Sequence, residues 1–270
     1  MKLFVLLLLV SCWAQNFADD SYSTVVVTGY WDVKGKHGAR EYDGWFRNSL
    51  RLNAPYIVYN DNPSIVSRFS GFRQGLPTTY IRRTILSFYS WSKYNESWTS
   101  WTHGIHVPSA ELGAIWTEKI AMLEDATKNA NFSTFDWFAW VDAGQAFYRH
   151  RSPPATPWPL PQNLKILPKD KLIYTGSREW QDDHDVAGTA FLMHRSFVKP
   201  LYDLFYEELD SCSRADNNWK CSSDQILFTR IRKRFPGKFF RIGNGYGNVV
   251  PLLFGPVPTQ EANATLARMR

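Results

Sequence analysis

Cysteine and long apolar runs are both scarce in this chain. Its 270 residues contain three cysteines, and after Leu3–Val10 no apolar run approaches the roughly 20 residues of a membrane-spanning helix. The charged start, the short apolar run and the small residues up to Ala14 predict a secretory signal peptide over residues 1–14, cleaved after Ala14. We therefore expect a secreted or lumenal protein of the endoplasmic reticulum or Golgi, with no membrane span after signal cleavage.

The sequence also lacks the motifs of several common enzyme classes. It has no Gly-x-Ser-x-Gly pentapeptide, which argues against a serine hydrolase of the α/β type, and no His-Glu-x-x-His, which argues against the corresponding zinc hydrolases. Neither the Rossmann nor the P-loop glycine spacing follows the first predicted strand. No nucleic-acid-binding motif accompanies the net charge of +6, so we expect no nucleic-acid partner.

Much of the positive charge lies in one segment, residues 230–238, with Arg241 just beyond it. This segment is either a solvated helix face or a site for an anionic ligand such as a nucleotide diphosphate. The loop Lys34-Gly-Lys-His-Gly38, directly after the first predicted strand, is a natural edge for a nucleotide pocket.

Glycosylation sequons and the remaining cysteines agree with the secretory pathway. Acceptor sequons begin at Asn95, Asn131 and Asn263. Signal cleavage leaves an even pair, Cys212 and Cys221, which an oxidising compartment would join in a local disulfide. A zinc site is the alternative, but no histidine lies close to this pair in the sequence.

Hydrophobic patterning predicts one α/β domain. Continuous β-branched and aromatic runs predict strands, and apolar residues every three or four positions predict helices. The predicted strands cover residues 23–30, 55–61, 135–141, 171–175, 186–193 and 239–242, and the predicted helices cover 42–52, 110–129, 196–209 and 226–234. Ser222-Ser-Asp-Gln225 is an N-cap sequence that leads into the last of these helices, so we expect Asp224 and Gln225 in its first turn. The opening strand, helix and strand form a βαβ unit with a parallel pair. We expect a mixed, mainly parallel sheet flanked by helices over residues 22–258, and a tail over 259–270.

The strand over residues 135–141 is where we expect the site to form. It is apolar and aromatic from Phe135 to Val141 and is followed by Asp142-Ala-Gly144. Such sheets bind ligands beyond the carboxyl ends of their strands, and a glycine there lets a backbone or a phosphate come close. The simpler alternative is that Asp142 forms a turn after the strand.

Other acids also lie in loops or at the ends of predicted elements. They are Asp32, Asp61, Asp182, Asp183, Asp185 and Asp224. With Asp142 and scattered lysines and arginines, they suit a hard divalent cation that bridges a diphosphate. A carboxylate would act as base toward an acceptor hydroxyl. A glycoside hydrolase also uses two carboxylates and is an alternative.

Several segments resemble one family when read in order across residues 24–250. They are Thr24-Val-Val-Val-Thr-Gly-Tyr-Trp-Asp32, Tyr42-Asp-Gly-Trp-Phe46, Ile57-Val-Tyr-Asn-Asp61, Trp116-Thr-Glu-Lys119, Phe138-Ala-Trp-Val-Asp-Ala-Gly144 and Ser223-Asp-Gln225. They resemble the HtrL/YibB family, and the block Trp-x-Asp-x-Gly is the most specific. That family looks like GT-A glycosyltransferases, in which an Asp-x-Asp motif ends a central strand and holds Mn²⁺ or Mg²⁺ on a nucleotide sugar.

The resemblance implies roles for individual residues. Asp142 matches the first acid of the motif, as metal or donor ligand, whereas Gly144 stands in place of the second acid. The implied cation, Mn²⁺ or Mg²⁺, would then be weakly held or dispensable. By the same resemblance, Thr28 and Asp61 would lie near the nucleotide, and Asp224 near the reacting sugar or the acceptor. Together with our interpretation of the other residues, the predicted donor-binding residues are Thr28, Tyr30, Asp61, Lys119, Asp142, Gly144, Gly188 and Gln225, and the candidate catalytic carboxylates are Asp224 and Asp183.

The resulting prediction is a glycosyltransferase of the secretory pathway. It would transfer a sugar from a nucleotide-sugar donor to a hydroxyl of a carbohydrate or glycoprotein acceptor. Gly144 and the missing membrane anchor motivate a second hypothesis, a secreted carbohydrate-binding protein on a degenerate glycosyltransferase fold. A glycoside hydrolase is the third.

Overall fold

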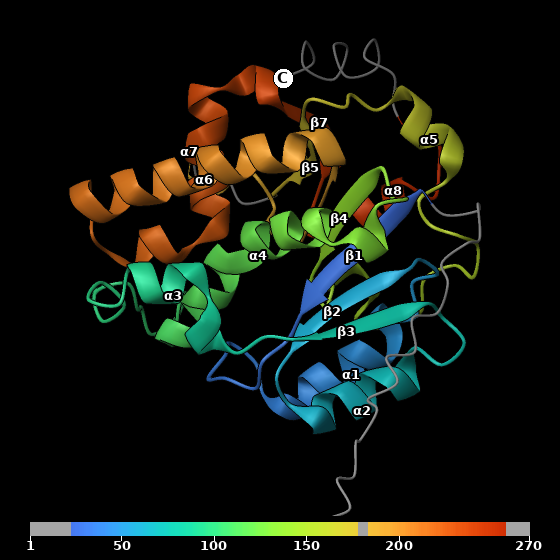
Figure 1. The fold of residues 1–270 in the computed structure, drawn as a ribbon, viewed down its shortest axis with the longest axis horizontal. Coiled ribbons are helices and arrows are strands. Elements are labelled where there is room, and N and C mark those ends of the chain that lie inside the picture. The colour runs from blue at the N-terminus through green and yellow to red at the C-terminus, as the bar shows by residue number, and fades with distance from the viewer. Residues whose placement is uncertain (1–22, 178–182, 258–270) are drawn as a thin grey trace, which may run out of the picture.

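A seven-stranded sheet forms the centre of the computed structural model, which describes residues 23–177 and 183–257 (Figure 1). The strands are β1 (Thr24–Gly29), β2 (Tyr56–Asn60), β3 (Thr78–Arg82), β4 (Trp137–Val141), β5 (Leu172–Gly176), β6 (Ala190–His194) and β7 (Phe239–Asn244). Their order across the sheet is β3-β2-β1-β4-β6-β5-β7. Only β6 is antiparallel to its neighbours, β4 and β5, within the described sheet. The predicted mixed, mainly parallel sheet is confirmed.

Helices cover both faces of this sheet. They are α1 (Ala39–Ser49), α2 (Pro63–Phe72), α3 (Tyr89–Lys93), α4 (Ala110–Lys128), α5 (Pro161–Ile166), α6 (Arg195–Ala215), α7 (Asp224–Arg234) and α8 (Val249–Leu252). Alternate strand residues point to opposite faces. Val27 and Trp140 therefore pack in the core beneath α4, α6 and α7, whereas Val26 and Ala139 pack in the core on the side of α1, α2 and α8. Because both faces are covered, the strands carry continuous apolar runs. The described residues form one α/β domain.

The strand directions bring several loops to one edge of the sheet. β1 and β4 are parallel, so Tyr30 and Asp142, which follow them, emerge at the same edge. β6 runs the opposite way, and the segment that leads into it, Gly188 and Thr189, reaches this edge too. The backbone N–H of Asp142 donates to the carbonyl of Thr189 at 2.9 Å and ties the two segments together.

Several predicted boundaries are wrong; the helix predicted over residues 42–52 is α1, which runs from Ala39 to Ser49. We predicted a strand from residue 186, but β6 begins at Ala190, because Val186 forms only an isolated bridge to Gly176. We predicted that the helix after this strand ends at residue 209, but α6 continues to Ala215. The predicted opening βαβ unit and the start of α7 at Asp224 are confirmed.

The sequence patterns did not predict α2 and β3. β3 is an edge strand with partly exposed residues, so it lacks the continuous apolar run of a central strand. The start of α2 did carry a signal, because Asn62 caps the Ser64 N–H and Pro63 occupies the first turn. In the proline-rich segment, Pro161 similarly opens α5.

A disulfide joins Cys212 of α6 to Cys221, as predicted. Cys221 lies in the 3₁₀ helix η4 (Trp219–Ser222), which leads directly into α7. No helix among the described residues is long and apolar enough to span a membrane. Asn95 and Asn131 are exposed, whereas the predicted signal peptide, Asn263, residues 259–270 and Asp182 lie outside the described residues.

Candidate functional site

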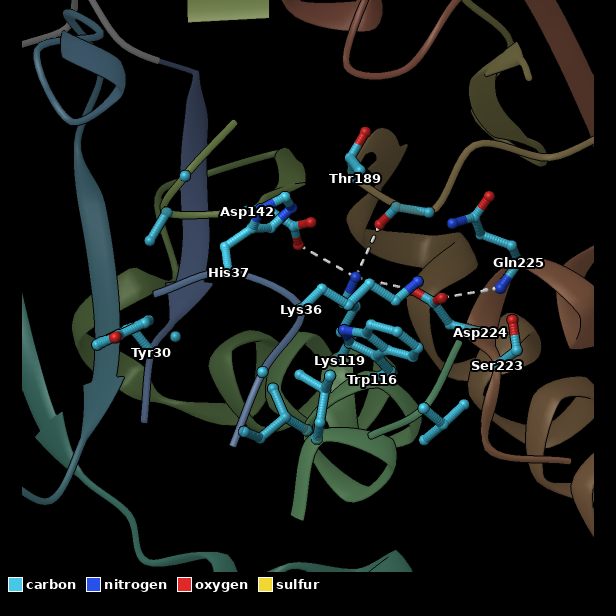
Figure 2. A pocket seen from close by; sticks show the side chains of 18 of the residues that line it. Tyr30, Lys36, His37, Trp116, Lys119, Asp142, Thr189, Ser223, Asp224 and Gln225 are labelled. Carbon is cyan, nitrogen blue, oxygen red and sulfur yellow. Dashed lines mark hydrogen bonds and ion pairs between the residues drawn. The ribbon is translucent and has the colours of Figure 1, made fainter. Parts of the chain in front are cut away.

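A cleft of about 370 Å³ opens at the edge where β1 and β4 end (Figure 2). One wall is formed by the end of β1 and the segment after it, from Gly29 to His37, and another by the first half of α4. Further lining residues come from the segment after β4, the segment before β6 and the first turn of α7; Trp219 and Tyr246 also line the cleft. The loop over residues 34–38, predicted as the edge of a nucleotide pocket, therefore lines this cleft through Gly35, Lys36 and His37.

Lys119 of α4 lies between two carboxylates in this cleft. Its Nζ atom is 3.1 Å from Asp142 Oδ1 and 2.7 Å from Asp224 Oδ2, and it donates a hydrogen bond to the carbonyl of Gly188 at 2.9 Å. Figure 2 shows the three contacts as dashed lines converging on the amine. Residues from a helix, a strand end, a loop and a second helix thus meet at one ammonium group.

Burial and the neighbouring charges shift the pKa values of Lys119 and Asp224 in opposite directions. Burial alone would lower the pKa of Lys119, but Asp142 and Asp224 outweigh it and raise that pKa, so the amine is charged at neutral pH. Burial raises the pKa of Asp224 above its usual value, although Lys119 opposes this shift. Removing one member would leave a buried charge without its partner, which is costly.

Asp142 is the more accessible of the two acids. Its side chain is 31% exposed, against 3% for Asp224. The indole N–H of Trp140, two residues earlier on β4, donates to Asp142 Oδ1 at 2.7 Å. This hydrogen bond and the contact with Lys119 hold one oxygen of Asp142, while the carboxylate faces the cleft.

Asp224 is fixed at the start of α7. The backbone N–H of Gln225 donates to Asp224 Oδ1 at 2.8 Å, and an acid at this helix end also interacts favourably with the helix dipole. Gly188 packs directly against the carboxylate, since an added Cβ atom would lie 2.5 Å from Oδ2. A glycine at 188 is therefore needed for the carboxylate to sit where it does.

Three buried oxygens at the cleft have no hydrogen-bond partner among the described residues: Thr189 Oγ1, Asp224 Oδ2 and Gln225 Oε1. Asp224 Oδ2 nevertheless lies 2.7 Å from Lys119 Nζ, so Thr189 Oγ1 and Gln225 Oε1 are the two that lack a polar contact. Buried polar atoms in proteins are usually hydrogen-bonded. In Figure 2 these side chains lie on one side of the Lys119 amine and Tyr30 lies on the other. We expect Thr189 Oγ1 and Gln225 Oε1 to contact polar groups of a ligand or water.

Aromatic and cationic side chains also lie at this cleft. The guanidinium of Arg149 lies 3.7 Å from the ring centre of Trp45 and donates to the carbonyl of Gly144 at 3.2 Å. The amine of Lys36 lies 4.9 Å from the ring centre of Trp116. Burial raises the pKa of Tyr30 to about 12, so its phenol stays protonated and can donate a hydrogen bond.

The structure brings most of the predicted site residues together. Those that line the cleft are Tyr30, Lys119, Asp142, Gly144, Gly188, Asp224 and Gln225. Thr28 is buried within β1, and Asp61 follows β2; neither is among the lining residues.

Asp183 also lies outside the lining. Burial raises its pKa, but hydrogen bonds from Lys220 and His184 outweigh this and lower it. Asp183 is therefore held as a carboxylate in a salt bridge beside the cleft, whereas its neighbour His184 lines it.

Sequence patterns missed Trp116, Arg149 and Thr189. Trp116 carried a signal, because it precedes Lys119 by three residues on a predicted helix and so shares its face. Arg149 and Thr189 carried no such signal, because their positions depend on how separate loops meet.

The basic segment 230–238 does not line the cleft. Its arginines instead form ion pairs, Arg230 with Asp216, Arg232 with Asp185 and Arg234 with Glu207. These pairs favour the helix-face interpretation.

Comparison with known proteins assigns this chain to no family. A scan against models of protein families and a search of curated proteins gave no match to this chain. The resemblance of its motifs to the HtrL/YibB family therefore stays a prediction.

Proposed function

We propose that the protein is a GT-A-type glycosyltransferase that moves a sugar from a nucleotide sugar to a hydroxyl of a carbohydrate or glycoprotein acceptor. The observation that carries this proposal is the convergence of Lys119, Asp142 and Asp224 in a cleft at the carboxyl edge of a mainly parallel sheet. Such an edge is the usual ligand site of open α/β sheets. The motif resemblance to the HtrL/YibB family supports the same proposal.

The cleft offers groups that match both parts of a nucleotide sugar. The rings of Tyr30 and Tyr42 offer apolar faces with polar edges, which suit a base and a ribose. Lys36 and Arg149 offer positive charge for a diphosphate. Elsewhere in the cleft, the unpaired oxygens Thr189 Oγ1 and Gln225 Oε1 would accept hydrogen bonds from sugar hydroxyls.

The proposed transfer needs one base and one stabilised leaving group. The acceptor hydroxyl attacks the anomeric carbon, the bond from that carbon to the diphosphate oxygen breaks, and the diphosphate leaves with the electron pair. A carboxylate takes the hydroxyl proton. Asp224 is the candidate base, because burial raises its pKa and so makes it a stronger proton acceptor than an exposed acid. Cations of the cleft would stabilise the charge that develops on the diphosphate.

Calorimetric titration with UDP, GDP and CDP sugars tests the proposal. We expect one donor series to bind, and Asp142→Asn to weaken that binding at least about 10-fold, or about 1.4 kcal/mol. Asp61→Asn is the matched control, because Asp61 also follows a parallel strand but does not line the cleft. The proposal fails if no donor binds, or if Asp142→Asn and Asp61→Asn bind like the original protein.

A non-catalytic carbohydrate-binding protein is the second candidate. Gly144 and the buried pairing of Asp224 with Lys119 favour it, because both reduce the number of free carboxylates in the cleft. The two candidates differ in one reaction: a transferase hydrolyses its donor slowly when no acceptor is present, and a binding protein does not. Release of free sugar from the bound donor would therefore decide for the transferase.

The proposed compartment has its own test. Expression of the full chain in a eukaryotic secretory host should yield a mature protein that begins at Gln15. Treatment with an endoglycosidase should increase its gel mobility if Asn95 or Asn131, both exposed, carries a glycan. An intracellular, unprocessed product would contradict the proposed localisation.

A further inference from the structure

The carboxylates that would hold a divalent cation are already occupied by a cation of the chain itself. A GT-A-type motif implies Mn²⁺ or Mg²⁺ at Asp142. The oxygens available there are Asp142 Oδ1, Asp224 Oδ2 and the carbonyl oxygen of Gly188, and Lys119 Nζ lies 3.1, 2.7 and 2.9 Å from them, respectively. A magnesium ion would need oxygens at about 2.0–2.1 Å. The ammonium and a divalent ion cannot share this position.

The surroundings of Gly144 oppose a second metal-binding acid. A Cβ atom at this position would lie 3.2 Å from the Trp45 ring and 3.5 Å from the Tyr42 ring. A side chain at 144 would therefore press against the Trp45 ring, which would have to move by a few tenths of an ångström. Among residues 23–177 and 183–257, no group of three or more His, Cys, Asp or Glu side chains is placed to hold a metal. The residues present do not fit the implied cation.

Lys119 is held firmly in its position. The residue is 3% exposed, its stem runs through the buried face of α4, and Nζ lies 5.5 Å from the ring centre of Trp140. Withdrawing the amine would leave two carboxylates unpaired, one of them buried, which is unfavourable. A divalent ion placed beside the charged amine would be repelled by it.

We propose that the Lys119 ammonium takes the place of the divalent cation, so that this cleft binds its ligand without a metal. The identity of that ligand rests on the proposed function. The claim about the cation rests only on the three oxygens around Lys119, so it can be tested without any nucleotide sugar.

Mn²⁺ titration followed by electron paramagnetic resonance tests this inference, because the signal of free Mn²⁺ falls as the ion binds. We expect no Mn²⁺ binding to the original protein that depends on Asp142. Lys119→Ala should bind one Mn²⁺ at least about 10-fold more tightly than the original protein, since two carboxylates and a carbonyl become free for a hard cation. Adding Asp142→Asn to Lys119→Ala should abolish this gain. Lys36→Ala is the matched control, because it removes a lysine from the same cleft and should gain no Mn²⁺ site.

Two results would overturn the inference. One is Mn²⁺ binding to the original protein that Asp142→Asn removes, a measurement that needs no Lys119 variant to fold. The other is a folded Lys119→Ala protein that binds Mn²⁺ no better than the original. Failure of every nucleotide sugar to bind would refute the proposed function and leave these Mn²⁺ results standing.

Discussion

Gly188 is the position where adding a single methyl group should disturb the site most. A Cβ atom there would lie 2.5 Å from Asp224 Oδ2, 2.8 Å from Cγ and 2.9 Å from Oδ1, whereas ordinary contacts begin at 3.4 Å. The neighbour that must move is a buried carboxylate at the start of α7, with both of its oxygens engaged. Gly188→Ala therefore requires Asp224 to shift by about 1 Å.

The energetic cost follows from what that shift disrupts. Moving Asp224 stretches either its 2.7 Å contact with Lys119 or its 2.8 Å hydrogen bond from the Gln225 N–H. Overpacking a well-packed site costs about 1–3 kcal/mol, and complete loss of one partner of a buried ion pair about 3–5 kcal/mol. Because the carboxylate keeps part of its contacts, we expect Gly188→Ala to lower the free energy of unfolding by about 2–3 kcal/mol.

Urea unfolding followed by tryptophan fluorescence, with the disulfide intact, measures this change. Gly44→Ala in α1 is the matched control, because a Cβ atom there meets nothing within 4 Å. Since alanine favours the helix over glycine, Gly44→Ala should raise the free energy of unfolding by about 0.5–1 kcal/mol. The reasoning is refuted if Gly188→Ala is as stable as the original protein or gains stability as the control does.

Three further predictions concern the frame around the cleft. Replacing Cys212 and Cys221 by serine should lower the free energy of unfolding by about 3 kcal/mol, because the bridge restricts a short loop in the unfolded chain; urea unfolding measures it. Arg73→Met should cost about 3–5 kcal/mol in the same assay, because its buried guanidinium donates to four backbone carbonyls that would lose this partner. Burial raises the pKa of Asp210, but hydrogen bonds from Lys93 and Tyr94 outweigh it and lower that pKa. The stabilisation by Asp210 is then present above its unfolded pKa of about 3.9 and is lost as the pH falls through the lower folded pKa, so the melting-temperature difference between the original protein and Asp210→Asn should shrink from about pH 7 to about pH 2.

Each of these predictions has a control. Reduction of the original protein should reproduce the stability of the double serine variant, and a large remaining difference would contradict the assignment to the disulfide. Arg51→Met replaces an exposed arginine and should change the free energy of unfolding by no more than about 0.5 kcal/mol. An equal loss in both arginine variants would show that the hydrogen bonds from Arg73 to the carbonyls are not the cause. A melting-temperature difference for Asp210→Asn that stays constant with pH would show that charge is not the cause.

Local patterns predicted the parts of the fold that depend on neighbouring residues. The apolar run over residues 135–141 predicted a central strand, and β4 is buried at each position from Trp137 to Val141. The segment Ser222-Ser-Asp-Gln225 predicted the start of α7, because a helix start depends on a few adjacent residues. β3 was not predicted, because an edge strand is only partly buried and its sequence is therefore not continuously apolar.

The candidate site needed more than local patterns. Asp61 and Asp142 both follow parallel strands and look equivalent in the sequence, but only Asp142 lines the cleft. The difference arises from strand order: β4 lies beside β6, whose leading segment contributes Gly188 and Thr189, whereas β2 lies on the far side of β1.

The sequence by itself determined the α/β class, the strand that ends in Asp142 and the helix that begins at Asp224, because each depends on periodicity or capping over a few neighbouring residues. Only the tertiary structure decided that Lys119 would join these two acids. That contact depends on the rotation of α4 against the sheet and on an antiparallel strand that brings Gly188 to the same edge. No local pattern contains this information, because the oxygens around the ammonium come from segments that are distant in the chain and meet only when the sheet is assembled.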